Sequence, residues 1–382
     1  MVPGGPRVEG ARGGTATSGR GVVTPRERRT SAGTGTAPAV HADEVEPAAR
    51  AVRSPWWGRS GILVAGGASV GVVVTTALRF SSALQEIRFG TVTLAGLSGL
   101  LTLGLAAVML AGAAWARRFD APGASWWALA ALVPVALVVQ YAFPTIVGLV
   151  APDRPGAGAR VTVLAQNMWY ESTDVEDQVE SLLRRDADVY VLSEFTPGAL
   201  EAFRENGLDR RLPYNVLRPR PGRLGMAVLS RIPFVPRAVE RYRIELDLTP
   251  PGAAPVHLIA SHSPAPTRVG IGAWHRELSV LARRAAHAGP NTVVVGDLNA
   301  TAGQVAFREL ASTGDLSDAQ DVGGGGFAAT WNLKSRLPPL LRLDHVLVGS
   351  GIGVDGFELA PRIGSDHRGI EATIVTRRAR ST

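Results

Sequence analysis

An apolar run in the second half of the chain ends in two polar residues that could do chemistry. In "VVVGDLNAT", from Val293 to Thr301, Asp297 and Asn299 stand two positions apart. Alternate side chains of a β-strand point to opposite faces, so we expect Asp297 and Asn299 to leave the sheet on the same side. A carboxylate and an amide placed in this way can act on one substrate.

Other apolar runs end in polar residues of the same few types. Any one of them could be a cap or a turn residue, but each stands where a predicted strand delivers its last side chain to the rim of a sheet. With Asp297 and Asn299 they make four carboxylates, two amides and two imidazoles. They are Asn167 in "LAQNMWY", Glu194 in "VYVLSEFTP", His262 in "HLIASHSPAP", Asp344 in "RLDHVLV", and Asp366 and His367 in "IGSDHRG".

These residue types suit metal-assisted cleavage of a phosphodiester. The oxygens of Glu194 and Asn167 are suitable ligands for Mg²⁺, a hard ion that needs few protein ligands because it keeps water and substrate phosphate oxygens. The bound ion would polarise the phosphoryl group. The sequence therefore predicts a divalent-cation site for Mg²⁺ or Mn²⁺ at the rim.

The order Asn, Glu, His, Asp-x-Asn, Asp and Ser-Asp-His resembles the endonuclease/exonuclease/phosphatase superfamily, here in a membrane-anchored bacterial form. The resemblance covers Val161 to about Thr376 and is most specific in the blocks "GDLNA" and "GSDHRGI". The blocks "GMAVLSRIP" and "TWN" resemble supporting motifs, with Asn332 where the family often has Pro. The superfamily includes pancreatic-type deoxyribonucleases, abasic-site endonucleases, sphingomyelinases and inositol polyphosphate phosphatases.

The resemblance implies a role for each polar residue of the metal site. Glu194 would be the main metal ligand, with Asn167 beside it. Asp366 would complete the metal shell or a second metal position.

The resemblance also implies the catalytic roles. Asp297 would orient or deprotonate the attacking water, and Asn299 would hold a phosphate oxygen. His367, held in one tautomer by Asp344, would act on the phosphate. His262 resembles the second histidine of the deoxyribonuclease and sphingomyelinase branches and would stabilise or protonate the departing oxygen.

Short β-rich runs alternate with helical stretches from Val161 onward, which favours one α/β domain. The resemblance makes this a four-layer α/β sandwich of two packed, mainly antiparallel sheets with the site at one rim. The expected strands include 161–165, 189–192, 227–229, 256–260, 293–295 and 345–348, and the expected helices include 174–185 and 274–287.

Three long apolar runs without a charged residue precede this domain: Ser60 to Leu78, Thr91 to Ala116 and Ala124 to about Val150. Each is long enough for the roughly 20 residues that cross a bilayer. Buried helices of a soluble domain are the alternative, but three such runs in succession favour three transmembrane helices. The tryptophan pairs at 56–57 and 126–127 suit the aromatic belt of a membrane interface.

Arginines flank the apolar runs unevenly, which predicts the orientation. They precede the first run and follow the second, whereas the connection between these runs holds only Arg79 and Arg88. Because cytoplasmic segments carry the positive excess, the N-terminal tail is expected in the cytoplasm and the catalytic domain on the extracytoplasmic side. The flanking residues are Arg50, Arg53, Arg59, Arg117 and Arg118.

The sequence thus divides into five parts. Residues 1–58 form a cytoplasmic tail of mainly small and polar residues, which we expect to be disordered. Residues 59–150 are the three-span membrane region and 151–160 a Pro- and Gly-containing linker. Residues 161–377 form the catalytic domain, and 378–382 a short tail.

Charge limits the choice of substrate. The net charge of the chain is +7, but 25 basic and 25 acidic residues lie from Val161 to the C-terminus. The catalytic domain therefore lacks the broad electropositive field of proteins that track long duplexes. The chain has no cysteine, which excludes thiolate metal sites and Cys nucleophiles.

The sequence predicts a membrane-anchored, metal-dependent phosphoesterase. Its substrate would be a nucleic acid, a phospholipid head group or a small phosphodiester, and nuclease and lipid phosphodiesterase are nearly equal alternatives. A phosphomonoester is also open. The alternative from another class is a non-catalytic membrane receptor or scaffold that uses the same fold for binding. The lipid bilayer is an expected partner, and no protein partner can be inferred.

Overall fold

The computed structural model describes residues 55–85, 89–137, 139, 158–266, 270–327, 329–336 and 338–378. Most of the predicted tail (1–58), of the predicted linker (151–160) and of the C-terminal segment (378–382) lies outside these residues.

Two six-stranded sheets form the predicted catalytic domain. In the first sheet, β1 and β2 run parallel, and the other neighbouring strands are antiparallel. Its order is β11 (Gly353–Leu359), β12 (Ile370–Val375), β1 (Arg160–Asn167), β2 (Val189–Ser193), β4 (Met226–Ser230) and β3 (Tyr214–Arg218).

The second sheet repeats this plan, with β7 and β8 as its parallel pair. Its order is β5 (Phe234–Val239), β6 (Arg243–Leu248), β7 (Val256–His262), β8 (Thr292–Asp297), β10 (Asp344–Gly349) and β9 (Leu316–Asp318). All six predicted strand runs lie within strands of these two sheets.

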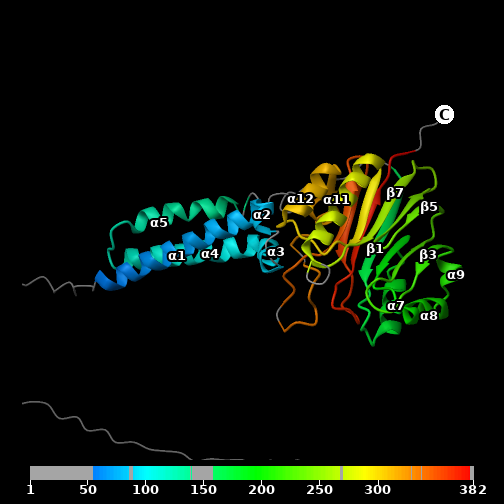
Figure 1. Ribbon diagram of the computed structural model, residues 1–382, viewed down its shortest axis with the longest axis horizontal. Helices are drawn as coiled ribbons and strands as arrows, with labels where there is room; N and C mark the ends of the chain where they lie inside the picture. The colour runs from blue at the N-terminus through cyan, green and yellow to red at the C-terminus, as the bar shows by residue number, and fades with distance from the viewer. Residues whose placement is uncertain are drawn as a thin grey trace, which may run out of the picture. The chain divides into compact units, whose positions relative to one another are not determined.

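Helices cover the outer faces of the two sheets, as Figure 1 shows. Along β1 the alternation of side chains decides the layers: Val161 and Val163 enter the core between the sheets, whereas Leu164 packs under the helices of the first sheet. The predicted α/β sandwich is confirmed. Its helices are α7 (Val175–Arg184), α8 (Pro197–Glu205), α9 (Leu208–Arg211), α11 (Ile271–Ala288), α12 (Val305–Thr313) and α13 (Ala319–Val322).

Two N-terminal helices are long and apolar enough to cross a membrane. They are Trp56–Phe80, within α1 (Pro55–Phe80), and α4 (Ser98–Arg118), with mean hydropathy 1.9 and 1.8. The two helices are antiparallel. Trp115 Nε1 near the end of α4 donates to Trp57 O at the start of α1, and Arg79 Nη1 at the end of α1 donates to Ser98 Oγ at the start of α4.

The second predicted apolar run is not one continuous helix. It is divided into α3 (Phe89–Gly96) and α4, and a short α2 (Ser82–Gln85) precedes it. Val92 of α3 is fully buried in one cluster with Trp274 of the catalytic domain. The prediction of a single span from Thr91 is therefore wrong for its first residues, of which Val92 and Ala95 are fully buried against protein.

The third predicted run begins as an apolar helix over Ala124–Leu137, which includes α5 (Ala124–Ala130). Apart from residue 139, the remainder of that run lies outside the described residues. The structure thus supports two of the three predicted spans by length and composition.

A charged cluster on β6 and β7 involves His257. The Nδ1 atom of His257 is 2.7 Å from Asp247 Oδ1, and its Nε2 atom is 3.7 Å from Glu245 Oε2. The interaction with Glu245 raises the pKa of His257 above its ordinary value of 6.5, and Asp247 adds to this against the effect of partial burial.

A His257→Gln variant should lose stability mainly at low pH. Protonated His257 stabilises the fold below its unfolded pKa of about 6.5, and this contribution disappears as the pH rises through the higher folded value. Thermal unfolding of the whole protein in detergent micelles should therefore show a larger loss at about pH 5.5 than at about pH 9.5. The exposed His287→Gln variant is the control. An equal loss from His257→Gln at both pH values would contradict the charge-based account.

Candidate active site

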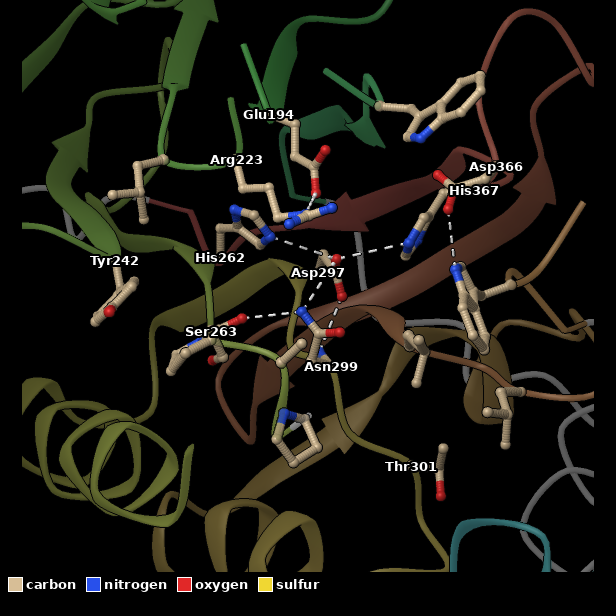
Figure 2. A pocket seen from close by; sticks show the side chains of 18 of the residues that line it. Glu194, Arg223, Tyr242, His262, Ser263, Asp297, Asn299, Thr301, Asp366 and His367 are labelled. Carbon is tan, nitrogen blue, oxygen red and sulfur yellow. Dashed lines mark hydrogen bonds and ion pairs between the residues drawn. The ribbon is translucent and has the colours of Figure 1, made fainter. Parts of the chain in front are cut away.

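The Asp297 carboxylate lies at the centre of the predicted polar residues (Figure 2). Its Oδ2 atom accepts a hydrogen bond from Asn167 Nδ2 at 3.0 Å and lies 3.6 Å from His262 Nε2 and 3.8 Å from His367 Nε2. Its Oδ1 atom accepts from the Asn299 backbone N–H at 2.9 Å. The side chain is 1% exposed, so these groups replace water around it.

Strand register explains part of this convergence. In the second sheet, Asp297 at the end of β8 is paired with His262 at the end of β7 and with Asp344 at the start of β10. Three neighbouring strands therefore bring these three residues into one row at the rim. In the first sheet, Asn167 ends β1 beside Ser193 of β2, and Glu194 follows directly.

Hydrogen bonds hold Asn167 and Glu194 of the first sheet at the rim. Asn167 Nδ2 also points to Glu194 Oε1 at 3.4 Å, while its Oδ1 accepts from Trp169 N at 2.9 Å. Glu194 Oε2 accepts from Tyr170 N at 3.0 Å. In this orientation Asn167 presents its amide N–H groups, and not its oxygen, to the carboxylates.

The backbone is strained at three positions of the rim. Trp169, Glu194 and Asn299 have φ values of 52°, 54° and 48°. Asn tolerates this left-handed region, but Trp and Glu rarely adopt it. Such conformations cost about 1–3 kcal/mol each, and surrounding packing must impose them. The strained residues therefore include the predicted metal ligand Glu194 and lie at the rim where the pocket is formed.

His367 is held by two carboxylates. Its Nδ1 atom is 2.8 Å from Asp344 Oδ2, and its Nε2 atom faces Asp297. Burial opposes the charge on the ring, but Asp344 and Asp297 outweigh it and raise the pKa of His367 to about 10. Burial raises the pKa of Asp297, against the lowering effect of His367. The ring is thus a cation at neutral pH, oriented by Asp344.

The residues fit a divalent cation in two places. Asp366 Oδ1 is buried and has no hydrogen-bond partner among the described residues, while Asp366 Oδ2 accepts from Trp331 Nε1. Burial raises the pKa of Asp366, and the nearby charge of Glu194 raises it further. A hard cation bound by these carboxylates would neutralise their charge. Ligand atoms of Asp297, Asp344 and His367 also lie within 4.8 Å of one another and could hold an ion.

The pocket has a volume of about 790 Å³, and six of the eight predicted residues line it. Asn167 and Asp344 are the exceptions and support the lining residues from behind. The Nδ2 atom of Asn299 donates to Ser263 O at 2.9 Å and lies 3.3 Å from Asp297 Oδ2. A phosphate oxygen would have to replace one of these bonds for Asn299 to take its predicted role.

Two residues were not predicted for the site. Arg223 lines the pocket with its Nε 4.0 Å from Glu194 Oε1. Its Nη2 donates to the Tyr170 hydroxyl at 2.8 Å, and Tyr170 also lines the pocket. Neither residue ends a strand, which was the signal used for the others. His345, by contrast, packs away from the site against Asp318 and Phe307, as its position next to Asp344 predicts.

The chain thus combines a two-sheet α/β sandwich with a rim of carboxylates, amides and imidazoles. The sequence model of the Endonuclease/Exonuclease/phosphatase family matches residues 164–367, more than half of the chain. The chain belongs to this family, as the resemblance predicts. No curated protein matches the chain.

Solved structures with a similar fold come from several organisms. TDP2 from D. rerio, complexed with a single strand DNA product, has 19% identity and a TM-score of 0.46 over 57% of this chain and 100% of that chain. The endonuclease/exonuclease/phosphatase from Beutenbergia cavernae has 17% identity and a TM-score of 0.42 over 57% and 72%. Sphingomyelinase C from Streptomyces griseocarneus has 18% identity and a TM-score of 0.41 over 56% and 99%.

The pair of His367 and Asp344 gives a test of the site. An Asp344→Asn substitution should lower kcat for phosphoester hydrolysis about 10²- to 10⁴-fold, because the ring would lose the charge that keeps it protonated and oriented. Asp318→Asn is the matched control. Asp318 pairs at 2.7 Å with His345, which lies next to Asp344 on β10, and neither Asp318 nor His345 lines the pocket. Equal kcat values for the two variants would contradict a role of the Asp344–His367 pair in the reaction.

Proposed function

We propose that the protein is a membrane-anchored, divalent-metal-dependent phosphoesterase that hydrolyses a phosphodiester by attack of an oriented water molecule. A phosphomonoester would undergo the same reaction. The observation that carries this proposal is the placement of Asp297 Oδ2 within 4 Å of Asn167, His262 and His367, in a pocket that Glu194 and Asp366 also line.

Glu194 and Asp366 are the proposed ligands of Mg²⁺ or Mn²⁺, with Asn167 beside them. When bound, the cation would neutralise charge on the phosphoryl oxygens. Asn167 becomes an oxygen ligand only if its amide turns over, so we assign it first to holding Glu194 and Asp297 in position. The trio of Asp297, Asp344 and His367 is a second possible place for the ion, since Asp344 Oδ1 is buried without a partner among the described residues. We assign the ion to Glu194 and Asp366 first, because Asp344 Oδ2 and His367 Nδ1 already bond to each other.

The remaining residues move protons and stabilise charge. Asp297 accepts a proton from the attacking water, and its raised pKa makes it a stronger base once ionised. His367, kept cationic by Asp344, binds a non-bridging phosphate oxygen and stabilises the negative charge of the transition state. His262 donates a proton to the leaving oxygen. Arg223, beside Glu194, offers a second cation to the phosphate.

The proposed location is the cell membrane, with several spans and the catalytic domain on the extracytoplasmic side. The support is the apolar length of α1 and α4 and the arginine distribution around them. The first connection, α2 and α3, contacts the catalytic domain, which agrees with both being on one side of the bilayer.

Metal removal tests the reaction. The purified protein with Mg²⁺ should hydrolyse at least one member of a panel of plasmid DNA, sphingomyelin, phosphoinositides and a small chromogenic diester. Activity should disappear with EDTA and return with added Mg²⁺ or Mn²⁺, because the carboxylates alone cannot neutralise the phosphoryl charge. Hydrolysis that persists unchanged in EDTA would contradict the metal-dependent mechanism.

The receptor or scaffold alternative has its own test. Asp297→Ala and His367→Ala should abolish the cellular role if catalysis is the function, since both residues touch the proposed reaction centre. Glu309→Ala, a surface change in α12, is the control. Full cellular function of both site variants at parental protein levels would favour the binding module.

A further inference from the structure

One wall of the catalytic pocket comes from a segment outside the family match. Val92, Thr93 and Gly96 of α3 line the pocket, whereas the match begins at residue 164. Leu341 and Leu343 line the pocket as well. A Cβ atom on Gly96 would lie 3.6 Å from Leu341 Cδ2, 3.3 Å from the Thr301 hydroxyl and 3.7 Å from Gln304 Nε2. Gly96 and Leu341 therefore lie side by side in one wall of the pocket, which also includes the polar ends of Thr301 and Gln304.

This wall lies at the other end of the pocket from the proposed metal ligands. The Thr301 hydroxyl is 3.4 Å from Gly96 O, so Thr301 marks the position of α3. Figure 2 shows Thr301 and Glu194 at opposite ends of the pocket, with Asp297 between them. The pocket therefore offers a charged end to a phosphate and an apolar end to one of its substituents.

Direct contacts fix α3 on the catalytic domain. Gln304 Nε2 donates to Val92 O at 3.2 Å, and the Val92 side chain is fully buried. A Cβ atom on Gly303 would lie only 2.2 Å from Ala95 O, so the two backbones touch and only glycine allows this approach. These contacts hold α3 in a fixed position at the pocket.

The preceding helix α2 is joined to the same place. The buried Gln85 accepts from the backbone N–H of Val305, the first residue of α12, at 2.9 Å. Its Nε2 atom donates to Leu78 O in the last turn of α1 at 2.6 Å. The end of α1, α2 and the start of α12 are therefore tied together by one side chain.

The apolar helices place this wall at the edge of the proposed bilayer. Gly96 stands two residues before Ser98, where α4 begins, which corresponds to about 3 Å along a helix. Leu94 on α3 and Leu340 beside the wall are 44% and 49% exposed. If α1 and α4 span the membrane, the apolar end of the pocket opens at the lipid surface.

We propose that α3 forms a lipid-chain subsite of the catalytic pocket, and that the substrate is a membrane phospholipid. This inference rests on the proposed phosphoesterase function. The phosphate binds among Asp297, His262 and His367, and the acyl-bearing substituent lies against Leu341 and the Gly96 face of α3. A polynucleotide fits less well, because its neighbouring phosphate would be desolvated against these apolar side chains.

Chain preference tests the subsite. Dioleoyl phosphatidylglycerol and its deacylated diester are compared as substrates of the whole protein in detergent micelles with Mg²⁺. The parent should favour the lipid at least about tenfold in kcat/KM, since apolar contacts of this size change specificity by about 10- to 200-fold. An equal or better rate on the deacylated diester, or preferential cleavage of plasmid DNA, would overturn the proposal.

A pair of matched variants locates the effect on α3. Gly96→Leu extends a side chain into the wall, whereas Gly90→Leu makes the same change on the same helix where a Cβ atom meets nothing within 4 Å. Gly96→Leu should lower kcat/KM for the lipid about tenfold and change the deacylated diester less than about twofold. Gly90→Leu should leave both unchanged. An equal loss of both substrates in a folded Gly96→Leu protein would contradict the subsite.

Binding without turnover separates this proposal from the proposed function. In EDTA, Gly96→Leu should bind labelled dioleoyl phosphatidylglycerol about tenfold more weakly than Gly90→Leu. If Gly96→Leu does not fold, Thr93→Glu places a carboxylate in the same wall and is compared in the same way. Equal binding would overturn the lipid subsite. A parent that hydrolyses no phosphoester would overturn the proposed function, and the binding comparison would still decide the role of α3.

Discussion

The site depends on one buried carboxylate. Asp297 is almost completely removed from water, and an isolated charge in that position would cost several kcal/mol. Hydrogen bonds from Asn167 and the Asn299 backbone, together with the two histidines nearby, offset this cost. The same contacts that make the charge tolerable also join the two sheets at their common rim. Stability of the rim and the arrangement that we propose for catalysis are therefore consequences of one set of interactions.

The polar rim could be predicted from the sequence because its signal is local. The expectation that each residue ends a strand holds for those at the ends of β1, β2, β7 and β8, whereas Asp344 begins β10 and Asp366 and His367 lie in the loop before β12. Six of the eight residues line the pocket. The buried strands β1, β2, β4, β7, β8 and β10 were predicted for the same reason. The position of Asp344 follows from strand register, which the sequence alone does not show. Its pairing opposite Asp297 places its carboxylate where it can orient His367.

Features that depend on tertiary contacts were not predictable. The strand β6 carries Arg243 and Glu245, which are buried because Arg243 pairs with Glu245 and with Glu277 on α11. Its polar sequence therefore did not indicate a strand inside the sheet. The edge strand β5 is largely exposed and lacks an apolar run. In α3, composition cannot distinguish a residue facing lipid from one facing protein. Val92 therefore looked like part of a membrane span although it packs on the catalytic domain.

The central claim is that the two sheets converge on one divalent-cation site at Glu194 and Asp366, next to the base Asp297. Anomalous diffraction from a crystal soaked with Mn²⁺ tests it most directly. The account predicts a manganese peak within coordination distance of the Glu194 and Asp366 carboxylates, and loss of the peak in a Glu194→Gln crystal. A peak held by Asp297, Asp344 and His367 instead, or no peak in the pocket at saturating Mn²⁺, would contradict it.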